Sequence, residues 1–280
     1  MADQFNALFY SADETSTKAT KPATSTAAPD LFSSFTSESG EEISMQQFNV
    51  LSNTSHLYQL IQGEMGIKLL LQNLLKQTSV SVDTETTSTD FLLAKLVGLA
   101  FSWEKGQGFF LPLPENDDDV KSILEKFKPF FENESIEKTG HNLKYDLKVL
   151  SRYGITVAGK LFDTMLAHYL INPDMRHSLD VLSETYLHYT PKSQSDLIGK
   201  GKTLISITKV PTEDLKEFAV EDADITGQLK TVFEKSLAEN EATKLFETIE
   251  IPLLVVLADM EREGIRLDVD FLRTLSLELD

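Results

Sequence analysis

The sequence contains no cysteine, a single tryptophan and no apolar run long enough to cross a bilayer. Without cysteine the chain has neither disulfides nor thiolate chemistry, and a membrane span needs about 20 apolar residues. The start of the chain also lacks the positively charged and continuously apolar segments of a secretory signal. We therefore expect a cytoplasmic protein with no membrane partner.

Positive charge is also scarce. The 26 Lys and Arg residues are outnumbered by 44 Asp and Glu residues, which gives a formal net charge of -18. This balance disfavours broad electrostatic capture of a nucleic-acid backbone by the chain alone. An acidic chain can still act on a phosphate when metal ions supply the positive charge. Metal-assisted phosphate chemistry therefore stays open.

Composition divides the chain into three segments. Residues 1–46 form a Ser/Thr-rich stretch, with fourteen of these residues before position 46, and predict a flexible linker. Residues 47–240 carry alternating strand and helix patterns and predict a folded domain. Residues 241–280 predict the beginning of a further region that is truncated.

Strand patterns come first in the folded domain. Residues 48–51 predict a short strand, and residues 57–75 show helical spacing with a break near 63–66. The apolar alternation that leads into Asp83 predicts a strand, and two more follow at 96–103 and 109–113. Three such strands in a row predict an antiparallel meander.

Helical patterns dominate the rest of the domain and alternate with short strands. A strand is predicted at 136–139 and another at 265–267. Helices are predicted at 118–131, 143–153, 164–171, 179–186, 212–237, 252–263 and 271–278. This order predicts an α/β layered domain with a mixed sheet.

Asp83 and Glu85 are two residues apart at the end of an apolar strand. Their side chains should therefore leave the same face of the sheet. Two acids that point toward one spot call for a cation. A solvent-facing strand end would show the same spacing, so the pattern alone leaves both interpretations open.

A second group of polar residues lies at a predicted strand-to-helix junction. Asn142 suits the N-cap of the following helix, and Asp146 lies one turn further along. Capping alone would explain Asn142, whereas Asp146 lies at the border of the buried stripe and needs a further reason. We interpret His141 as a structural hydrogen-bonding residue.

The long helix at 212–237 carries a third group. Phe218 and Asp222 are one turn apart on the same face. An acid on a face that also carries a phenylalanine is costly to bury unless it is neutralised. We expect Glu221 and Asp224 to point elsewhere and to be solvated.

These three segments resemble the exonuclease motifs of the 3′→5′ proofreading domain of family A DNA polymerases, the Klenow-type domain of bacterial DNA polymerase I. Residues 83–86, 142–146 and 218–222 match the first, second and third motif. The resemblance extends through residues 96–99, 162–165, 199–202 and 221–224, and covers roughly residues 47–280. It implies a ribonuclease H-like (DnaQ-like exonuclease) fold, an α/β mixed sheet flanked by helices.

The resemblance also implies a cofactor and a reaction. Asp83, Glu85, Asp146 and Asp222 would hold two divalent metal ions, Mg²⁺ or Mn²⁺, which favour oxygen ligands. One ion would generate the attacking hydroxide and the other would stabilise the departing 3′ oxygen. The substrate would be a single-stranded or frayed 3′ end of DNA, and the products nucleoside 5′-monophosphates.

Substrate contacts are implied for Asn142, Thr84 and Thr89, and some positions depart from the family pattern. Phe218 replaces the usual tyrosine, whose hydroxyl helps to orient the water, so we expect slower hydrolysis. Thr89 stands where the family has an apolar wedge, and the stretch around Gln194 lacks the family's aromatic residue. A weak or inactive exonuclease-like scaffold and a ribonuclease D-like RNA exonuclease are the alternatives.

The flanking segments fit the same resemblance. Residues 251–265 resemble the start of the polymerase region, so the partners would include the polymerase region and a 5′ nuclease region of one longer chain. This would be a bacterial, nucleoid-associated protein of DNA replication and repair. We expect no polymerase activity from these 280 residues alone.

Overall fold

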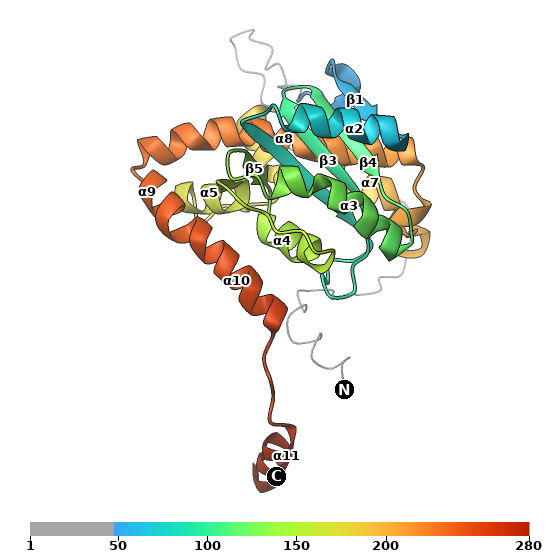
Figure 1. Cartoon of the computed structure of the whole chain (residues 1–280). Helices are drawn as coiled ribbons and strands as arrows, with labels where there is room; N and C mark the ends of the chain where they lie inside the picture. The colour runs from blue at the N-terminus through green and yellow to red at the C-terminus, as the bar shows by residue number, and fades with distance from the viewer. Residues whose placement is uncertain (1–47, 280) are drawn as a thin grey trace, which may run out of the picture. The chain divides into compact units, whose positions relative to one another are not determined.

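The computed structural model describes residues 48–279, and the predicted linker at 1–46 lies outside the described residues (Figure 1). The strands are β1 (Leu57–Leu60), β2 (Ser79–Thr86), β3 (Leu96–Glu104), β4 (Gln107–Pro112), β5 (Glu137–Gly140) and β6 (Leu161–Asp163). The α-helices are α2 (Gly63–Leu74), α3 (Asp117–Phe131), α4 (Leu143–Arg152), α5 (Thr164–Ile171), α6 (Leu179–Leu182), α7 (Gln194–Ile198), α8 (Thr212–Glu239), α9 (Thr243–Leu245), α10 (Ile251–Glu263) and α11 (Val269–Leu279).

The strands form one mixed sheet in the order β1-β4-β3-β2-β5-β6. The meander β2-β3-β4 is antiparallel, as its three consecutive apolar patterns predict. Strand β5 runs parallel to β2, β6 runs parallel to β5, and β1 runs parallel to β4. Strand β2 is therefore an inner strand with an antiparallel neighbour on one side and a parallel neighbour on the other.

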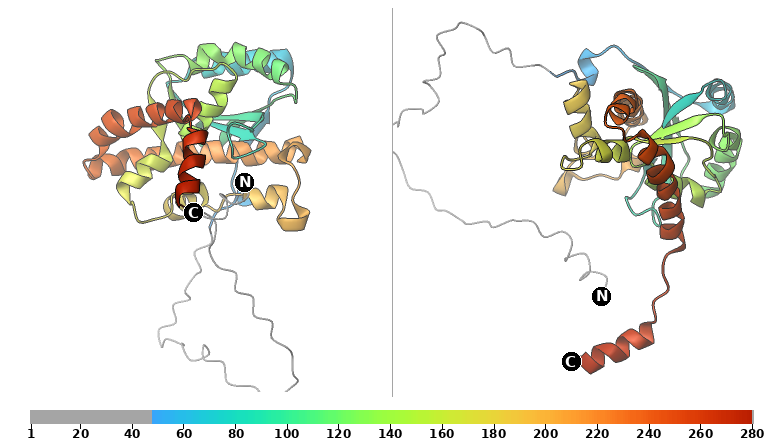
Figure 2. Two further views of the ribbon diagram at one scale, coloured as in Figure 1. Left: turned by 90° about the horizontal axis from the view of Figure 1, so that it is seen from below. Right: turned by 90° about the vertical axis from the view of Figure 1, so that its left-hand side faces the viewer.

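Helices cover both faces of this sheet. In Figure 1, α2, α3 and α4 lie in front of the sheet and α8 lies behind it, and the left view of Figure 2 shows the same two layers. The front layer buries Val80 and Val82 of β2 together with Phe101 and the phenylalanines of α3. The back layer packs Ala219, Val220 and Ala223 of α8 against β3 and β4.

Two glycines let α8 lie close to the sheet. A Cβ atom on Gly108 of β4 would stand 2.3 Å from Cγ1 of Val220, and one on Gly227 of α8 would stand 2.8 Å from Oγ of Ser81. Neither position has room for a side chain unless its neighbour moves. Asp222 lies between these two contacts along the helix, so they fix its height above the sheet.

The first elements differ from the prediction. Residues 57–60 form strand β1 rather than helix, because their side chains alternate between exposed and buried at the edge of the sheet. The helix predicted around them begins only at Gly63. The strand predicted at 48–51 is also wrong, since Asn49 forms a single bridge to Tyr189 and residues 51–53 form a 3₁₀ turn.

The later elements agree better, although short ones differ and the helices α7 and α9 were not predicted. Helix α5 spans the predicted residues, and Gly264 ends α10 with a φ of +71°, as expected of a C-cap. Strand β6 has three residues and was not predicted, whereas residues 265–267 are exposed and form no strand. The domain boundary predicted at 240–241 falls between α8 and α9 and stays a prediction.

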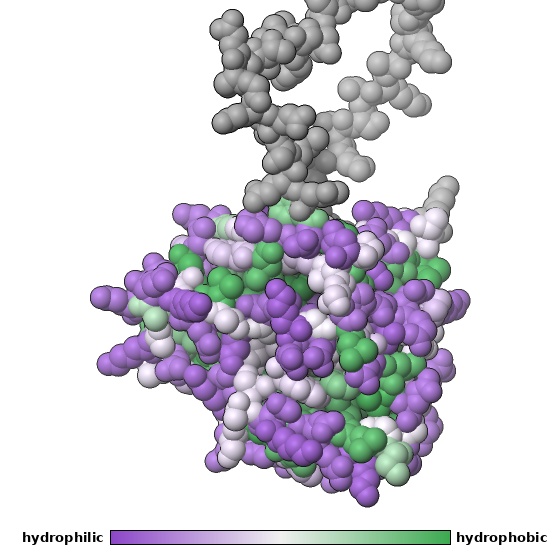
Figure 3. Space-filling view, turned by 90° about the horizontal axis from the view of Figure 1, so that it is seen from above, coloured by the Kyte–Doolittle hydropathy of each residue, from purple (hydrophilic) through white to green (hydrophobic). Residues whose placement is uncertain are grey.

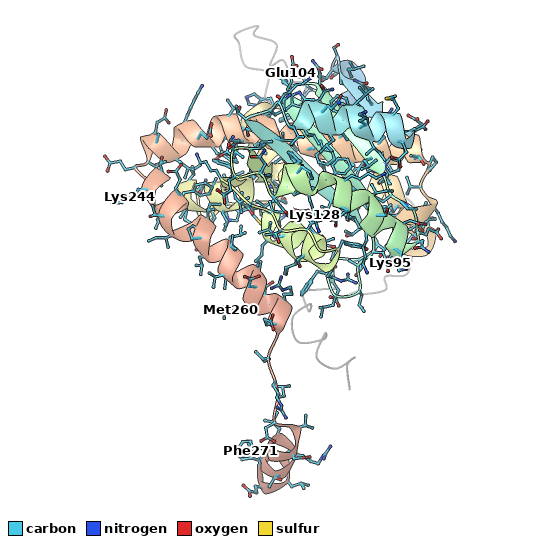
Figure 4. The ribbon with its side chains drawn as sticks, in the orientation of Figure 1. Lys95, Glu104, Lys128, Lys244, Met260 and Phe271 are labelled. Atoms are coloured by element: carbon cyan, nitrogen blue, oxygen red, sulfur yellow. The ribbon has the colours of Figure 1, made fainter. Side chains whose placement is uncertain are left out.

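The surface of the described residues is mixed in character. Figure 3 shows a face on which hydrophilic residues predominate around smaller hydrophobic patches. Within residues 48–279, no helix combines the length and the apolar character that a membrane crossing requires. All residues from 259 to 279 are exposed, including Met260 and Phe271, which Figure 4 labels.

Candidate active site

Three of the predicted acids line one cleft of about 910 Å³. Asp83 and Glu85 alternate with the buried valines of β2, so they share the sheet face of Ser81, which lies against α8. Asp222 of α8 lines the cleft with them. The structure therefore brings together acids that are about 140 positions apart in the sequence.

The fourth acid, Asp146, approaches from the opposite layer. It lies in the first turn of α4, is 4% exposed, and does not line the cleft itself. The hydroxyl of Thr84 donates a hydrogen bond of 2.5 Å to Oδ1 of Asp146. This bond ties Asp146 of α4 to the strand end that carries Asp83 and Glu85.

The start of α4 is fixed by an acid from a neighbouring strand. Asn142 is the N-cap residue, as predicted, but it has a φ of +63° and its side chain makes no capping hydrogen bond. Asp163 accepts hydrogen bonds from the backbone N–H groups of Leu143, Met165 and Leu166 instead. It thus caps α5 and positions α4, and with it Asp146.

Burial raises the pKa values of all four acids, and repulsion by neighbouring acids raises three of them further. Burial raises the pKa of Asp83 from 3.8 to about 6. The pKa of Glu85 is raised by burial and by the charges of Asp83 and Asp146, and that of Asp146 by burial and by Asp83. Burial and the charges of Asp83 and Glu85 raise the pKa of Asp222. The four acids therefore interact electrostatically.

No cation of the described chain neutralises this group. None of the four acids forms an ion pair with a lysine or arginine in residues 48–279. Oε1 of Glu85 is buried and has no hydrogen-bond partner there. A buried carboxylate oxygen without a partner is costly, and its natural complement is a cation.

The acids are not arranged as a closed metal-ligand shell. In the part of the chain that the structure describes, no three acidic or histidine side chains stand together so that they could hold a metal ion. Asp146 does not line the cleft itself, but its Oδ1 accepts a hydrogen bond from Thr84, which does. The donor set consists only of carboxylate oxygens, which suits a hard divalent cation such as Mg²⁺ or Mn²⁺.

The other predicted site residues also line the cleft. Phe218 lies one turn before Asp222 on α8 and is 8% exposed, so the cleft wall carries a phenyl ring without a hydroxyl at this position. Thr84, Thr89 and Asn142 line the same cleft. Gln194, at the start of α7, lines it as well.

Sequence reasoning missed three residues of this cleft. The hydroxyl of Tyr145 bonds to Thr86 at 2.6 Å and to the carbonyl of Ser88 at 2.5 Å. Asp180 lines the cleft and its charge contributes to the raised pKa of Asp222. Lys192 lines it from the loop before α7. Tyr145 could have been predicted because it lies within the second motif. The local sequence around Asp180 and Lys192 gives no indication that they line the cleft.

Two acids of α8 were predicted wrongly as solvated. Glu221 is fully buried and accepts hydrogen bonds from the Tyr189 hydroxyl and from the backbone N–H of Lys192. Asp224 is 5% exposed and accepts from the Tyr58 hydroxyl at 2.8 Å and from the backbone N–H of Gly106 at 3.0 Å. Hydrogen-bond donors that are distant in the sequence offset the cost of burying these two acids.

Comparisons with known proteins show which family the chain belongs to. The family model described as 3′-5′ exonuclease matches residues 58–238. DNA polymerase I of Borreliella burgdorferi is 33% identical over 233 residues, which are 82% of this chain and 25% of that protein. The chain spans about a quarter of the length of the curated relatives it matches.

Solved structures agree on the fold. NrnC of Brucella melitensis with bound Mg²⁺ aligns with a TM-score of 0.57 and 18% identity, covering 75% of this chain and 95% of NrnC. The POL domain of Pol1 from M. smegmatis, in complex with DNA primer-template and dNTP, aligns with a TM-score of 0.60 and 22% identity, covering 79% of this chain and 34% of that chain.

The mixed sheet flanked by helices is the ribonuclease H-like fold of DnaQ-type exonucleases. Within this class the chain belongs to the 3′-5′ exonuclease family, and it corresponds to the exonuclease domain of DNA polymerase I.

Proposed function

We propose that this chain is a 3′→5′ exonuclease that hydrolyses 3′-terminal phosphodiesters with two divalent metal ions and releases nucleoside 5′-monophosphates. The observation that carries the proposal is the group of repelling carboxylates on β2, α4 and α8, of which Glu85 is buried and leaves one oxygen unpartnered. A structural role alone gives no reason to gather unneutralised acids in a cleft.

The proposed ligands are Asp83, Glu85, Asp146 and Asp222. When bound, divalent ions would supply Lewis acidity and the charge that neutralises a phosphodiester. The chain's own contribution is to hold the carboxylates in place: β2 fixes Asp83 and Glu85, and the close packing of α8 fixes Asp222. The Mg²⁺ in the NrnC structure supports the choice of ion.

The cleft walls would position the 3′ end of the strand. Thr84, Thr89 and Asn142 line the cleft beside the acids and are the proposed substrate contacts. Phe218 offers an apolar surface next to Asp222 and no hydroxyl to orient a water molecule. We therefore expect modest hydrolysis rates rather than complete inactivity.

We propose DNA as the substrate, in a single-stranded or frayed form. The DNA polymerase I relatives support this choice. The same relatives are about four times as long as the matched segment, which supports the polymerase region of a longer chain as a partner. Apolar residues exposed on α10 and α11, including Val256, Met260 and Phe271, suit such a contact.

The experiment uses the 280-residue chain with a 3′-labelled single strand and with a primer whose 3′ end is mismatched. We expect mononucleotide release with Mg²⁺ or Mn²⁺, and a loss of about 10³-fold in Asp83→Ala, since a metal contributes several kcal/mol to such reactions. A matched RNA strand tests the ribonuclease D-like alternative. No release from either strand with either ion would leave the scaffold alternative.

A further inference from the structure

The cleft has a strongly uneven charge. Its lining includes the acids Asp83, Glu85, Asp180 and Asp222, and Asp146 is hydrogen-bonded to Thr84 of the lining. Among the described residues that line it, Lys192 is the single basic one. Lys192 is exposed and forms no ion pair with an acid in residues 48–279. Its ammonium group is therefore available to a ligand in the cleft.

The backbone of Lys192 is held by a buried carboxylate. Its N–H donates a hydrogen bond of 2.9 Å to Oε2 of Glu221, and the Tyr189 hydroxyl donates to the other oxygen of the same carboxylate. Glu221 is fully buried and directly precedes Asp222 on α8. One carboxylate thus ties the loop that carries Lys192 to the helix that carries a proposed metal ligand.

Two further features make this loop rigid. Pro191 fixes one backbone dihedral angle directly before Lys192. The preceding residues pair with Asn49, whose backbone N–H donates to the carbonyl of His188 at 3.0 Å and whose carbonyl accepts from Thr190 at 2.8 Å. A solvated surface lysine needs no such support, whereas a lysine that must meet a phosphate at one place benefits from it.

We propose that Lys192 binds a non-scissile phosphate of the nucleic-acid strand in the cleft, and that Glu221 is a positioning residue that acts through Lys192. This inference rests on the proposed exonuclease function, because it requires a strand in this cleft. Metal ions would neutralise the phosphate at the acids, and Lys192 would neutralise a neighbouring one. It would thereby counter the repulsion that an acidic chain exerts on a polyanion.

Binding is measured apart from hydrolysis, by the fluorescence anisotropy of a labelled single DNA strand with Mg²⁺. The last linkages of this strand are phosphorothioates, which slow its cleavage. We expect Lys192→Gln to raise Kd roughly threefold to tenfold, as expected for one lost phosphate contact. The slope of log Kd against log salt concentration should become shallower by about 0.7, and Lys192→Arg should preserve both quantities.

The matched control is Lys244→Gln, since Lys244 is an exposed lysine on α9 that does not line the cleft (Figure 4). Its Kd and slope should equal those of the parent chain. Unchanged Kd and salt slope in Lys192→Gln would overturn the role of Lys192. A parent chain that binds the strand without cleaving it would instead overturn only the proposed function, and one that does not bind would overturn both.

The role of Glu221 is tested through non-additivity. Glu221→Ala should raise Kd by a factor similar to that of Lys192→Gln, and the double variant should show no further increase, because the two residues act as one unit. KM in the nuclease assay should follow Kd, with kcat near the parent value. A purely structural role would lower Tm and leave Kd unchanged at temperatures where the variant is folded.

Discussion

Two groups of acids on and around α8 differ in their partners. Glu221 and Asp224 accept hydrogen bonds from tyrosine hydroxyls and backbone N–H groups. In the described part of the chain, Asp83, Glu85 and Asp222 receive no side-chain donor and no cation. We call the first pair the satisfied acids and the other three the cleft acids. Satisfied acids stabilise the fold, whereas cleft acids oppose it until a cation binds.

The largest expected effect concerns stability. Asp224→Ala would leave the Tyr58 hydroxyl and the Gly106 N–H without their acceptor, so it should cost about 2–3 kcal/mol of unfolding free energy. Asp222→Ala, in the presence of a chelator, should leave stability unchanged or raise it, because it removes repulsion. Urea unfolding measures both variants, and equal losses would contradict the distinction.

The second effect is a dependence of stability on pH. The pKa of Asp83 is raised from 3.8 to about 6 in the folded state, so protonation favours folding. Its contribution is complete below about pH 4 and is lost as the pH rises through 6. Metal-free protein should therefore be more stable at pH 5 than at pH 7, by about 1–2 kcal/mol.

Magnesium at pH 7 should restore this stability, since it replaces the protons as the counter-charge. The comparison is made by thermal unfolding at both pH values with chelator and with Mg²⁺. In Asp83→Asn the gain at pH 5 should be smaller. If the Tm of the parent chain changes with neither pH nor Mg²⁺, the proposed distinction between cleft acids and satisfied acids is wrong.

The smallest effect concerns Phe218. Phe218→Tyr places a hydroxyl beside Asp222, where it would orient a water molecule, and should raise kcat up to about tenfold with KM unchanged. Phe218→Leu serves as the apolar control and should give no gain. A tyrosine variant that is slower than the parent would show that a hydroxyl at this position does not help to orient the water.

The sequence predicted the sheet meander and most helices because their apolar periodicity is strong. It failed at β1, an edge strand in which only Tyr58 is buried, and at β6, which is only three residues long. The motifs also located Asp83 and Asp222 at the cleft. Local pattern could not reveal that Glu221 and Asp224 are buried, because their partners Tyr189 and Tyr58 lie 32 and 166 residues away.

The bare backbone at Gly108 and Gly227 has a consequence for the chemistry of the cleft. The absence of side chains at these two positions sets the distance between α8 and the sheet. A single methyl group at either position would push α8 away from the sheet and move Asp222 away from Asp83. The gap between two carboxylates is thus regulated by residues that carry no functional group at all.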